Sequence, residues 1–327
     1  MRGNHHIVIE SENLKYEFDI KRNITVIQGE SASGKTTLID LLNEHLRRRG
    51  AGGIRMQSDV SCAVYVAGED NWEYELKGLS GKIVFFDEDY RFIYTKEFAE
   101  YAGKADNYFV FITRKPLKNL PYSINEIYGI RTTGKYHFPE QVYHEFYPIY
   151  EDKCNLIEPK ARLMILVEDK ESGYEFFTKV SDACKTVSAE GNAGIFPKML
   201  EIPSDERVLV VADGAAFGAY AETVVKYAKK NGKVGLYFPE SFEWMVLKSG
   251  VLEDNEIDRV LAEPENYIDS QEYISWERFF TALLIEKSQK ERYMRYSKTK
   301  LPDYYLEDRN RKRIVDVIPE EIRMLLE

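Results

Sequence analysis

Residues 26–39 of this 327-residue chain read VIQGESASGKTTLI, and this stretch decides the fold of the amino-terminal half. Positions 29–36 match the pattern G-x-x-x-x-G-K-S/T in full. An apolar run that predicts a strand precedes the pattern, and a run with leucines at helical spacing follows it. Glycines at both ends let the backbone wrap around phosphate groups, and the helix N-terminus adds partial positive charge. The stretch therefore predicts a phosphate-binding loop between a strand and a helix.

The loop pattern also assigns chemistry to its polar residues. Lys35 would reach the β- and γ-phosphates of a nucleotide, and the hydroxyl of Thr36 would ligate Mg²⁺. ATP and Mg²⁺ are therefore the expected cofactors. The residues expected to contact the nucleotide are Gly29, Glu30, Ser31, Ala32, Ser33, Gly34, Lys35, Thr36 and Thr37.

Residues 83–88, IVFFDE, form a second motif, an apolar strand that ends in two acids. Asp87 would hold Mg²⁺ through water, and Glu88 would orient or deprotonate the attacking water. The next predicted strand, residues 107–113, ends beside Arg114. We expect Arg114 to sense the γ-phosphate; the alternative is that it only caps a loop near Pro116.

Over about residues 1–135 the two motifs resemble the Walker A and Walker B motifs of P-loop NTPases, closest to the ATP-binding-cassette and recombination-type ATPases. The resemblance implies a mostly parallel sheet and ATP hydrolysis. The chain departs from the pattern because residues 79–81, LSG, run straight into the second motif, with no signature helix behind them. Nucleoside kinases are the nearest rival, although they usually carry an Arg-rich lid.

A second series of strands and helices begins near residue 162, and three of its predicted strands are followed by acids. Glu168 and Asp213 each follow an apolar run, and Glu240 and Glu243 follow the last strand of the series. The carboxyl ends of parallel strands share one edge of a sheet, where ligands collect. Carboxylates there suit Mg²⁺, which can hold a phosphodiester and activate water. Glu168 and Asp213 are the expected catalytic pair, and all four acids are candidate metal ligands.

Over about residues 160–262 this arrangement resembles the Toprim fold of topoisomerases, primases and the overcoming-lysogenization-defect nucleases. Glu168 matches the family's glutamate and Asp213 its first aspartate, but Ala215 replaces the second aspartate. Glu240 or Glu243 is the expected substitute. The resemblance implies an ATPase joined to a Mg²⁺-dependent nuclease, acting in defence against mobile elements, with the ATP state gating the acidic residues.

Two other functions fit the sequence. The missing second aspartate favours a nucleotide-dependent switch or adaptor, in which the carboxy-terminal domain is inert and only binds a partner. A kinase for a small substrate is the third candidate.

We expect four parts: a P-loop domain over residues 1–135, an irregular connector over 136–159, a Toprim-like α/β domain over 160–262 and a helical tail over 263–327. Residues 286–313 of the tail carry ten Lys or Arg against five Asp or Glu, with tyrosines interleaved. Such a stretch could follow a phosphate backbone while its rings stack on bases. A charge-mixed helix surface is the alternative.

The composition narrows the class of protein. A formal charge of −10 argues against a protein that coats nucleic acid broadly, so any contact with DNA or RNA must be local or metal-mediated. Three separated cysteines with no CxxC pair fit a reducing cytoplasm and give no zinc site. No apolar run approaches the ~20 residues of a membrane span, so we expect no membrane partner. The candidate partners are ATP, DNA or RNA, another protein and a second copy of the chain.

Overall fold

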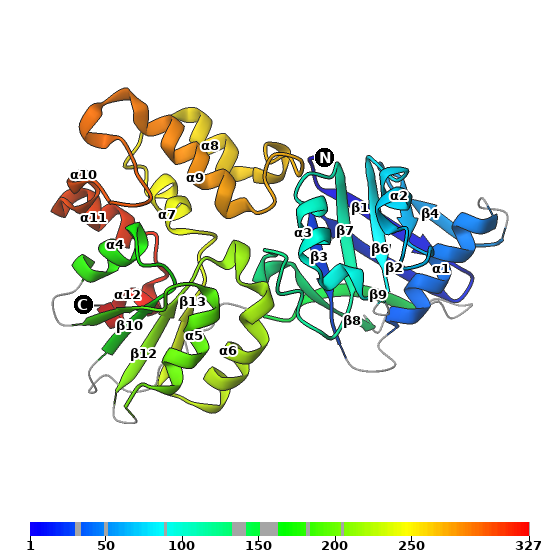
Figure 1. The fold of residues 1–327 in the computed structure, drawn as a ribbon, viewed down its shortest axis with the longest axis horizontal. Helices are drawn as coiled ribbons and strands as arrows, with labels where there is room; N and C mark the ends of the chain where they lie inside the picture. The colour runs from blue at the N-terminus through cyan, green and yellow to red at the C-terminus, as the bar shows by residue number, and fades with distance from the viewer. Residues whose placement is uncertain are drawn as a thin grey trace. The chain divides into compact units, whose positions relative to one another are not determined.

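The computed structural model describes residues 1–29, 34–48, 52–87, 90–132, 142–150, 163–180, 184–203 and 206–326. The chain forms two compact α/β units (Figure 1). The first unit comprises residues 1–149 and 263–275, and the second comprises 150–262 and 276–327. This division differs from the predicted one, because the tail is not a separate part. Most of the tail belongs to the second unit, and its first residues return to the first unit.

The first unit contains a nine-stranded sheet with the order β4-β1-β2-β9-β8-β3-β7-β6-β5. The pairs β2–β9, β3–β7, β3–β8, β5–β6 and β6–β7 are parallel, and β1–β2, β1–β4 and β8–β9 are antiparallel. The strands are β1 (His5–Glu10), β2 (Leu14–Ile20), β3 (Ile24–Ile27), β4 (Arg55–Gln57), β5 (Cys62–Val64), β6 (Lys82–Phe86), β7 (Asn107–Ile112), β8 (Ile127–Thr132) and β9 (Val142–Pro148). The expectation of a mostly parallel sheet is confirmed.

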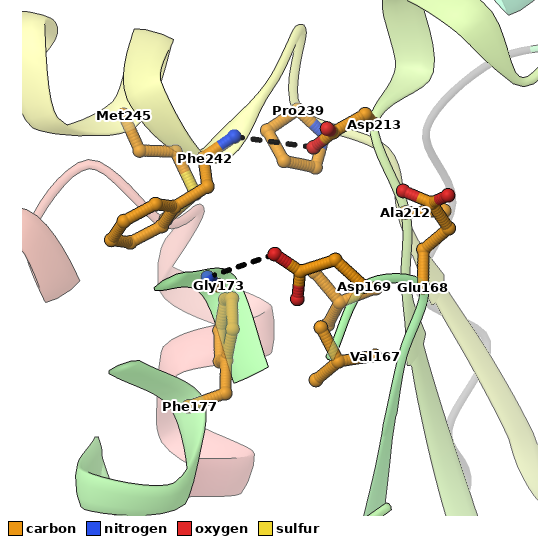
Figure 2. A pocket seen from close by; sticks show the side chains of 11 residues that line it. Val167, Glu168, Asp169, Gly173, Phe177, Ala212, Asp213, Pro239, Phe242 and Met245 are labelled. Carbon is orange, nitrogen blue, oxygen red and sulfur yellow. Dashed lines mark hydrogen bonds between the residues drawn. The ribbon is translucent and has the colours of Figure 1, made fainter. Parts of the chain in front are cut away.

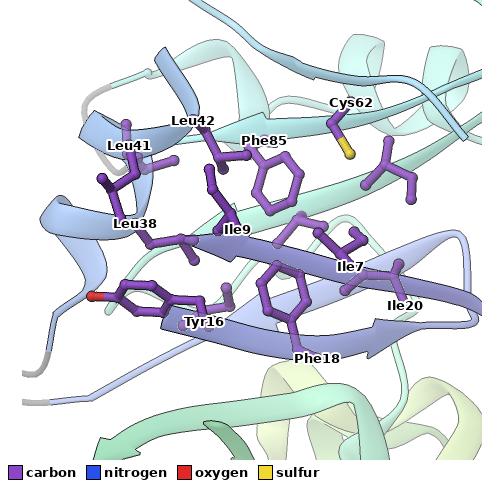
Figure 3. Close-up of a cluster of buried hydrophobic side chains, with 14 of the residues drawn as sticks. Ile7, Ile9, Tyr16, Phe18, Ile20, Leu38, Leu41, Leu42, Cys62 and Phe85 are labelled. Atoms are coloured by element: carbon purple, nitrogen blue, oxygen red, sulfur yellow. The ribbon is translucent and has the colours of Figure 1, made fainter. Parts of the chain in front are cut away.

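Burial explains why these strands form where they do. Every residue of β3 and β7 is buried, as expected for central strands that are covered on both faces. In β1 and β2, buried residues alternate with more exposed ones, so only one face of each packs inward. The helix α1 (Lys35–Arg48) covers that face with Leu38, Leu41 and Leu42. Figure 3 shows these leucines against the side chains of β1 and β2.

The prediction of an irregular connector over residues 136–159 is wrong for residues 142–150, the part that the structure describes. Here β9 forms a full strand between β2 and β8. Prolines and turn residues around this stretch favour an irregular segment, so the strand was not predicted. Its parallel partner β2 is also distant in the sequence, so no local pattern indicates the pairing. Residues 133–141 and 151–162 lie outside the described residues. The unit also contains two short α-helices, α2 (Trp72–Lys77) and α3 (Lys96–Ala102).

The second unit contains a four-stranded sheet in which every pairing is parallel, with the order β11-β10-β12-β13. The strands are β10 (Leu163–Val167), β11 (Lys185–Ser188), β12 (Arg207–Val211) and β13 (Val234–Tyr237). The helices α4 (Ser172–Val180), α5 (Asn192–Leu200) and α6 (Gly218–Lys230) alternate with them, as predicted. The chain leaves β10 toward β11 and returns to the other side of β10 with β12. The strand order therefore reverses between β10 and β12, which is where ligands bind in such sheets.

The remaining helices of the second unit are α7 (Phe242–Lys248), α8 (Asn255–Ala262), α9 (Trp276–Lys287), α10 (Asp303–Leu306), α11 (Asp308–Val315) and α12 (Glu320–Leu326). Helix α9 packs against α7 and against the 3₁₀ turn Gly214–Ala216 that follows β12. Its buried face includes Phe280 and Leu284. The tail is helical, as predicted, and it packs beside the sheet of this unit.

Residues 263–275, which we call the return segment, belong to the first unit. The backbone N–H of Gly3 donates to the carbonyl of Glu265 at 2.8 Å, and the Asn23 side-chain amide donates to the carbonyl of Ile274 at 2.7 Å. The Ser270 hydroxyl donates to the carbonyl of Ala105 at 3.2 Å. These bonds fix the segment beside the amino ends of β3 and β7. Across the part of the chain that the structure describes, no helix is both long and apolar enough to cross a bilayer.

Candidate functional site

Gly29 and Gly34, the two glycines of the phosphate-loop pattern, are among the described residues, and both have positive φ. Gly29 and Gly34 have φ values of 145° and 91°, in the region that favours glycine. Lys35 is the first residue of α1, and its ammonium donates to the carbonyl of Gly29 at 2.9 Å. The lysine therefore reaches from the start of the helix to the first glycine of the pattern. Glu30, Ser31, Ala32 and Ser33 lie outside the described residues.

An aromatic pair that the sequence did not predict supports the end of the loop. The hydroxyl of Tyr16, on β2, donates to the carbonyl of Gly34 at 2.9 Å, and burial raises the pKa of Tyr16 to about 12. The ring of Tyr16 stacks on His144 of β9, with centroids 4.4 Å apart and planes 11° from parallel. A Cβ on Gly34 would lie 2.7 Å from the Tyr16 hydroxyl oxygen. Gly34 is therefore required both by its φ and by this close approach.

The other predicted nucleotide residues follow strands that neighbour β3. Asp87 follows β6, and Arg114 lies just beyond β7; these strands run parallel beside β3. Gly29, Asp87 and Arg114 thus stand at the same carboxyl edge, which we call the loop edge. Thr36 is exposed in the first turn of α1, where its hydroxyl is accessible to a ligand, and Thr37 is half-buried beside it. Glu88 lies outside the described residues.

In the second unit, Glu168 and Asp213 follow the adjacent strands β10 and β12, at the point where the strand order reverses. Figure 2 shows both side chains beside a small cavity at this edge, and both are lining residues of that cavity. One carboxylate oxygen of Asp213 accepts the N–H of Phe242 at 3.2 Å. The neighbouring Asp169 stabilises the start of α4, because its carboxylate accepts the N–H groups of Gly173 and Tyr174 in the first turn of that helix.

The two acids expected to replace the missing aspartate have different surroundings. Glu243, on α7, is 1% exposed, and one of its oxygens accepts the Tyr296 hydroxyl at 2.7 Å. Its other oxygen, Oε2, is buried and has no hydrogen-bond partner among the described residues. The backbone carbonyl of Glu240 accepts the N–H of Ala215 at 3.1 Å. Glu243 is among the charged groups that act on Asp213.

Two charged residues from the tail, which the sequence did not single out as a pair, reach the same edge. Lys298 donates to a carboxylate oxygen of Glu277, on α9, at 2.7 Å. The loop that carries Lys298 is fixed to α4, because the Lys298 carbonyl accepts the N–H of Ser172 at 3.2 Å. We call the group Glu168, Asp213, Glu243 and Glu277 the acidic edge. Nothing in the local sequence distinguishes Glu277 from the other acids of a charged tail, so only the packing of α9 reveals it.

Burial and mutual repulsion raise the pKa values of two acids at this edge, Glu168 and Asp213. The pKa of Glu168 is raised to about 7, first by burial and then by the charges of Glu277 and Asp169. The pKa of Asp213 is raised well above its usual range, first by burial and then by Glu277, Glu168 and Glu243. Burial lowers the pKa of Lys298, but Glu277 and Glu243 more than compensate, so its net shift is upward. Burial and the neighbouring negative charges therefore favour the protonated forms of Glu168 and Asp213.

The donor chemistry of the acidic edge fits a hard divalent cation, which prefers carboxylate oxygens. The unpartnered Glu243 oxygen is a further donor available for such an ion. As the side chains stand, however, no group of three or more His, Cys, Asp or Glu within the described ranges is placed to hold a metal ion. Binding would therefore require these side chains to close around the ion.

The prediction of a nucleic-acid-binding surface on the tail is wrong for two of its tyrosines. Tyr296 and Tyr305 are buried, at 3% and 0% exposed, and the Tyr305 hydroxyl donates to the carbonyl of Met294. These rings are core residues and cannot stack on bases. Arg292, Tyr293 and Arg295 remain exposed.

In comparisons of the sequence, no protein-family model and no curated protein matches this chain. The functional interpretation therefore depends on the geometry of the two edges.

Proposed function

We propose that this protein is an ATP-dependent, Mg²⁺-dependent nuclease, in which the first unit binds and hydrolyses ATP and the second cleaves phosphodiester bonds of DNA or RNA. The observation that supports the proposal is the position of Glu168 and Asp213 beside one small cavity at the strand-order reversal of a parallel sheet. The pKa values of both carboxyls are raised, and such perturbed acids are typical of functional sites.

The loop edge supports the ATP-binding half of the proposal. Glycines with positive φ frame the loop, and Lys35 starts the helix behind it, as binding of β- and γ-phosphates requires. In the proposed role, Thr36 and Asp87 would hold Mg²⁺, Glu88 would direct the attacking water, and Arg114 would sense the γ-phosphate. On this proposal the first unit is a P-loop NTPase and the second is Toprim-like.

In the proposed role, Glu168 and Asp213 would be the metal-binding residues of a phosphodiesterase at the acidic edge. Mg²⁺, when bound there, would neutralise charge on the phosphodiester. Glu168 lies beside Asp213, and a carboxylate in this position can accept a proton from the attacking water and return it to the leaving oxygen. Lys298, paired with Glu277, adds a positive charge beside the carboxylates that can attract the phosphate.

The return segment supplies a covalent route between the two activities. It is bonded to the first unit through Asn23 and Ala105, and it ends at Ser275, two positions before Glu277. We propose that the ATP state gates the nuclease through this connection.

A direct assay tests the proposal. Purified full-length protein is incubated with end-labelled DNA and RNA, with and without ATP and with Mg²⁺ or Mn²⁺. We expect metal-dependent cutting or nicking that responds to ATP, together with metal-dependent ATP hydrolysis. Protein that hydrolyses ATP but never cuts any nucleic acid under these conditions would contradict the nuclease assignment.

The second candidate function is a nucleotide-dependent switch whose second unit only binds a partner. Two observations favour it: Ala215 stands where the Toprim pattern has an aspartate, and Lys298 already pairs with Glu277. Substitutions Glu168→Gln and Asp213→Asn distinguish the two functions. A switch keeps its biological activity with these changes, whereas a nuclease loses it.

A further inference from the structure

A buried tyrosine of the tail, Tyr296, connects two helices of the second unit through its hydroxyl. This hydroxyl donates to Oε1 of Glu243, on α7, at 2.7 Å, and it lies 2.7 Å from the hydroxyl of Ser172, on α4. A tyrosine hydroxyl carries one proton, so Ser172 is the donor in the second bond. All three side chains are buried. We call Ser172, Tyr296 and Glu243 the tyrosine bridge.

The tyrosine bridge lies next to two backbone donors at the cavity of Figure 2. On one side, the N–H of Gly173 donates to the Asp169 carboxylate at 3.0 Å. On the other side, the N–H of Phe242 donates to the Asp213 carboxylate at 3.2 Å. Figure 2 shows both bonds, and all four of these residues line the cavity. Each donor is the chain neighbour of a bridge residue, so the bridge ties together the two turns that hold these carboxylates.

The backbone around Tyr296 holds the ring in place. The N–H of Tyr296 donates to the Ser288 hydroxyl at 2.9 Å. Two positions further on, the carbonyl of Lys298 accepts the N–H of Ser172 at 3.2 Å. The tail is therefore bonded to the start of α4 through its backbone as well as through the tyrosine hydroxyl.

We propose that Tyr296 is a positioning residue for the strand-end carboxylates of the second unit. By bridging Ser172 and Glu243, it holds the turns that follow β10 and β13 at one separation. The carboxylates of Glu168 and Asp213 beside the cavity then keep the relative arrangement that cleavage requires. This inference rests on the proposed function, because it assigns a role within that same site.

The test compares Tyr296→Phe with Tyr305→Phe in the full-length protein. Tyr305 is the matched control, because it is also a buried tyrosine of the tail, and its hydroxyl donates to the Met294 carbonyl at 2.6 Å. Each change removes one buried hydroxyl, so both should lower the Tm by a few degrees. In cleavage assays we expect Tyr296→Phe to lower kcat by about tenfold or more, with KM for the nucleic acid unchanged, because a small displacement of reacting groups suffices. Tyr305→Phe should keep the kcat of the wild type.

Ser172→Ala breaks the same bridge from its other end. We expect this variant to lower kcat as well. The double variant Ser172→Ala/Tyr296→Phe should lose less activity than the product of the two single losses, because residues in one hydrogen-bond network act together. Single losses that simply multiply would show that the two residues act separately, which overturns the bridge.

Hydrogen exchange gives a readout that does not depend on cleavage. We expect the N–H groups of Gly173 and Phe242 to exchange about tenfold faster in Tyr296→Phe than in Tyr305→Phe. Equal exchange in the two variants would overturn the positioning role. If the wild type cleaves nucleic acid and Tyr296→Phe keeps the kcat of Tyr305→Phe, that role is also overturned, and the proposed function stands. If the wild type cleaves nothing, the proposed function fails, and faster exchange in Tyr296→Phe still shows that Tyr296 holds the two turns.

Discussion

The loop edge and the acidic edge both lie at the carboxyl ends of parallel strands, each in its own sheet, yet they present opposite chemistry. The loop edge offers a lysine and backbone geometry set by Gly29 and Gly34, which suit an anionic phosphate. The acidic edge offers carboxylates, and the pKa values of two of them, Glu168 and Asp213, are raised. The comparison teaches that similar strand ends can present either chemistry, because the residues that follow each strand set the charge of the edge.

The largest expected effect separates the two edges by mutation. Lys35→Ala removes the ammonium that would stabilise the phosphates, and we expect ATP hydrolysis to fall by about 100-fold or more, with Mn²⁺ binding at the acidic edge unchanged. Asp213→Asn should reduce nuclease activity by about 100-fold or more while ATP hydrolysis without nucleic acid stays intact. Steady-state ATPase and cleavage assays measure both.

Exposed residues give the matched controls for this pair. Lys104→Ala and Asp258→Asn each remove a charge of the same sign from the surface, and neither should change either activity. If Asp213→Asn abolished ATP hydrolysis as well as cleavage, the two edges would not be separate sites and the comparison would break.

The second prediction uses the pKa of Glu168. Because this pKa is raised to about 7, a cation at the acidic edge must displace a proton that Glu168 holds below that pH. We expect Mn²⁺ affinity in the absence of nucleotide to be about tenfold higher at about pH 8 than at about pH 6. Calorimetry at the two pH values measures this, and proton release should accompany binding. An affinity independent of pH over this range would show that Glu168 is not part of the cation site.

Much of the fold follows from the sequence because periodic apolar runs dictate it. The predicted strands of both series form, and so does the helix after the phosphate loop. Their buried faces come from apolar residues that lie close together in the sequence, so the pattern is visible locally. Strand β9 escaped prediction because its neighbour β2 is distant and prolines surround it. At the loop edge, the phosphate loop can be predicted from one contiguous motif, and Asp87 and Arg114 from the ends of two further apolar strands.

The acidic edge is only half readable from the sequence. Glu168 and Asp213 are visible because each follows an apolar strand. Glu277 and Lys298 come from helical and irregular parts of the tail, and only packing brings them to the edge. We expected the tyrosines of this stretch to stack on bases, but the same packing buries Tyr296, and its hydroxyl donates to Glu243. Tertiary contacts between distant segments leave no local pattern, and this limits what the sequence can predict.

The third prediction concerns stability. Folded protein holds the Glu168 proton up to about pH 7, whereas the unfolded chain releases it near the ordinary value of 4.5, so this group destabilises the fold as pH rises through that window. We therefore expect Glu168→Gln to stabilise the second unit by about 1–3 kcal/mol at about pH 8 without metal. This corresponds to a rise in Tm of a few degrees, and the gain should vanish near about pH 4.

Metal provides the control for the stability measurement. Mg²⁺ should raise the Tm of the wild type, because a ligand that binds only the folded state stabilises it, and it should raise the Tm of the variant less. A variant that is less stable than the wild type at about pH 8 would show that the Glu168 charge is favourably compensated inside the fold.

The smallest expected effect tests the aromatic support of the loop edge. Tyr16→Phe removes the hydrogen bond to the Gly34 carbonyl but leaves the ring that stacks on His144. We expect a loss of about 1 kcal/mol in stability and a severalfold weaker affinity for ATP. Fluorescence titration with an ATP analogue measures the affinity, and Mn²⁺ binding at the acidic edge should not change. A Tyr16→Phe protein that binds ATP normally would make the bond a fold contact only.

The position of Mn²⁺ in a crystal grown with that ion tests the central claim most directly, because anomalous scattering locates the metal without assumptions. We predict an anomalous peak within bonding distance of the Glu168 and Asp213 carboxylates. Crystals grown at saturating Mn²⁺ with no peak at this edge would contradict the assignment of the second unit as a metal-dependent nuclease.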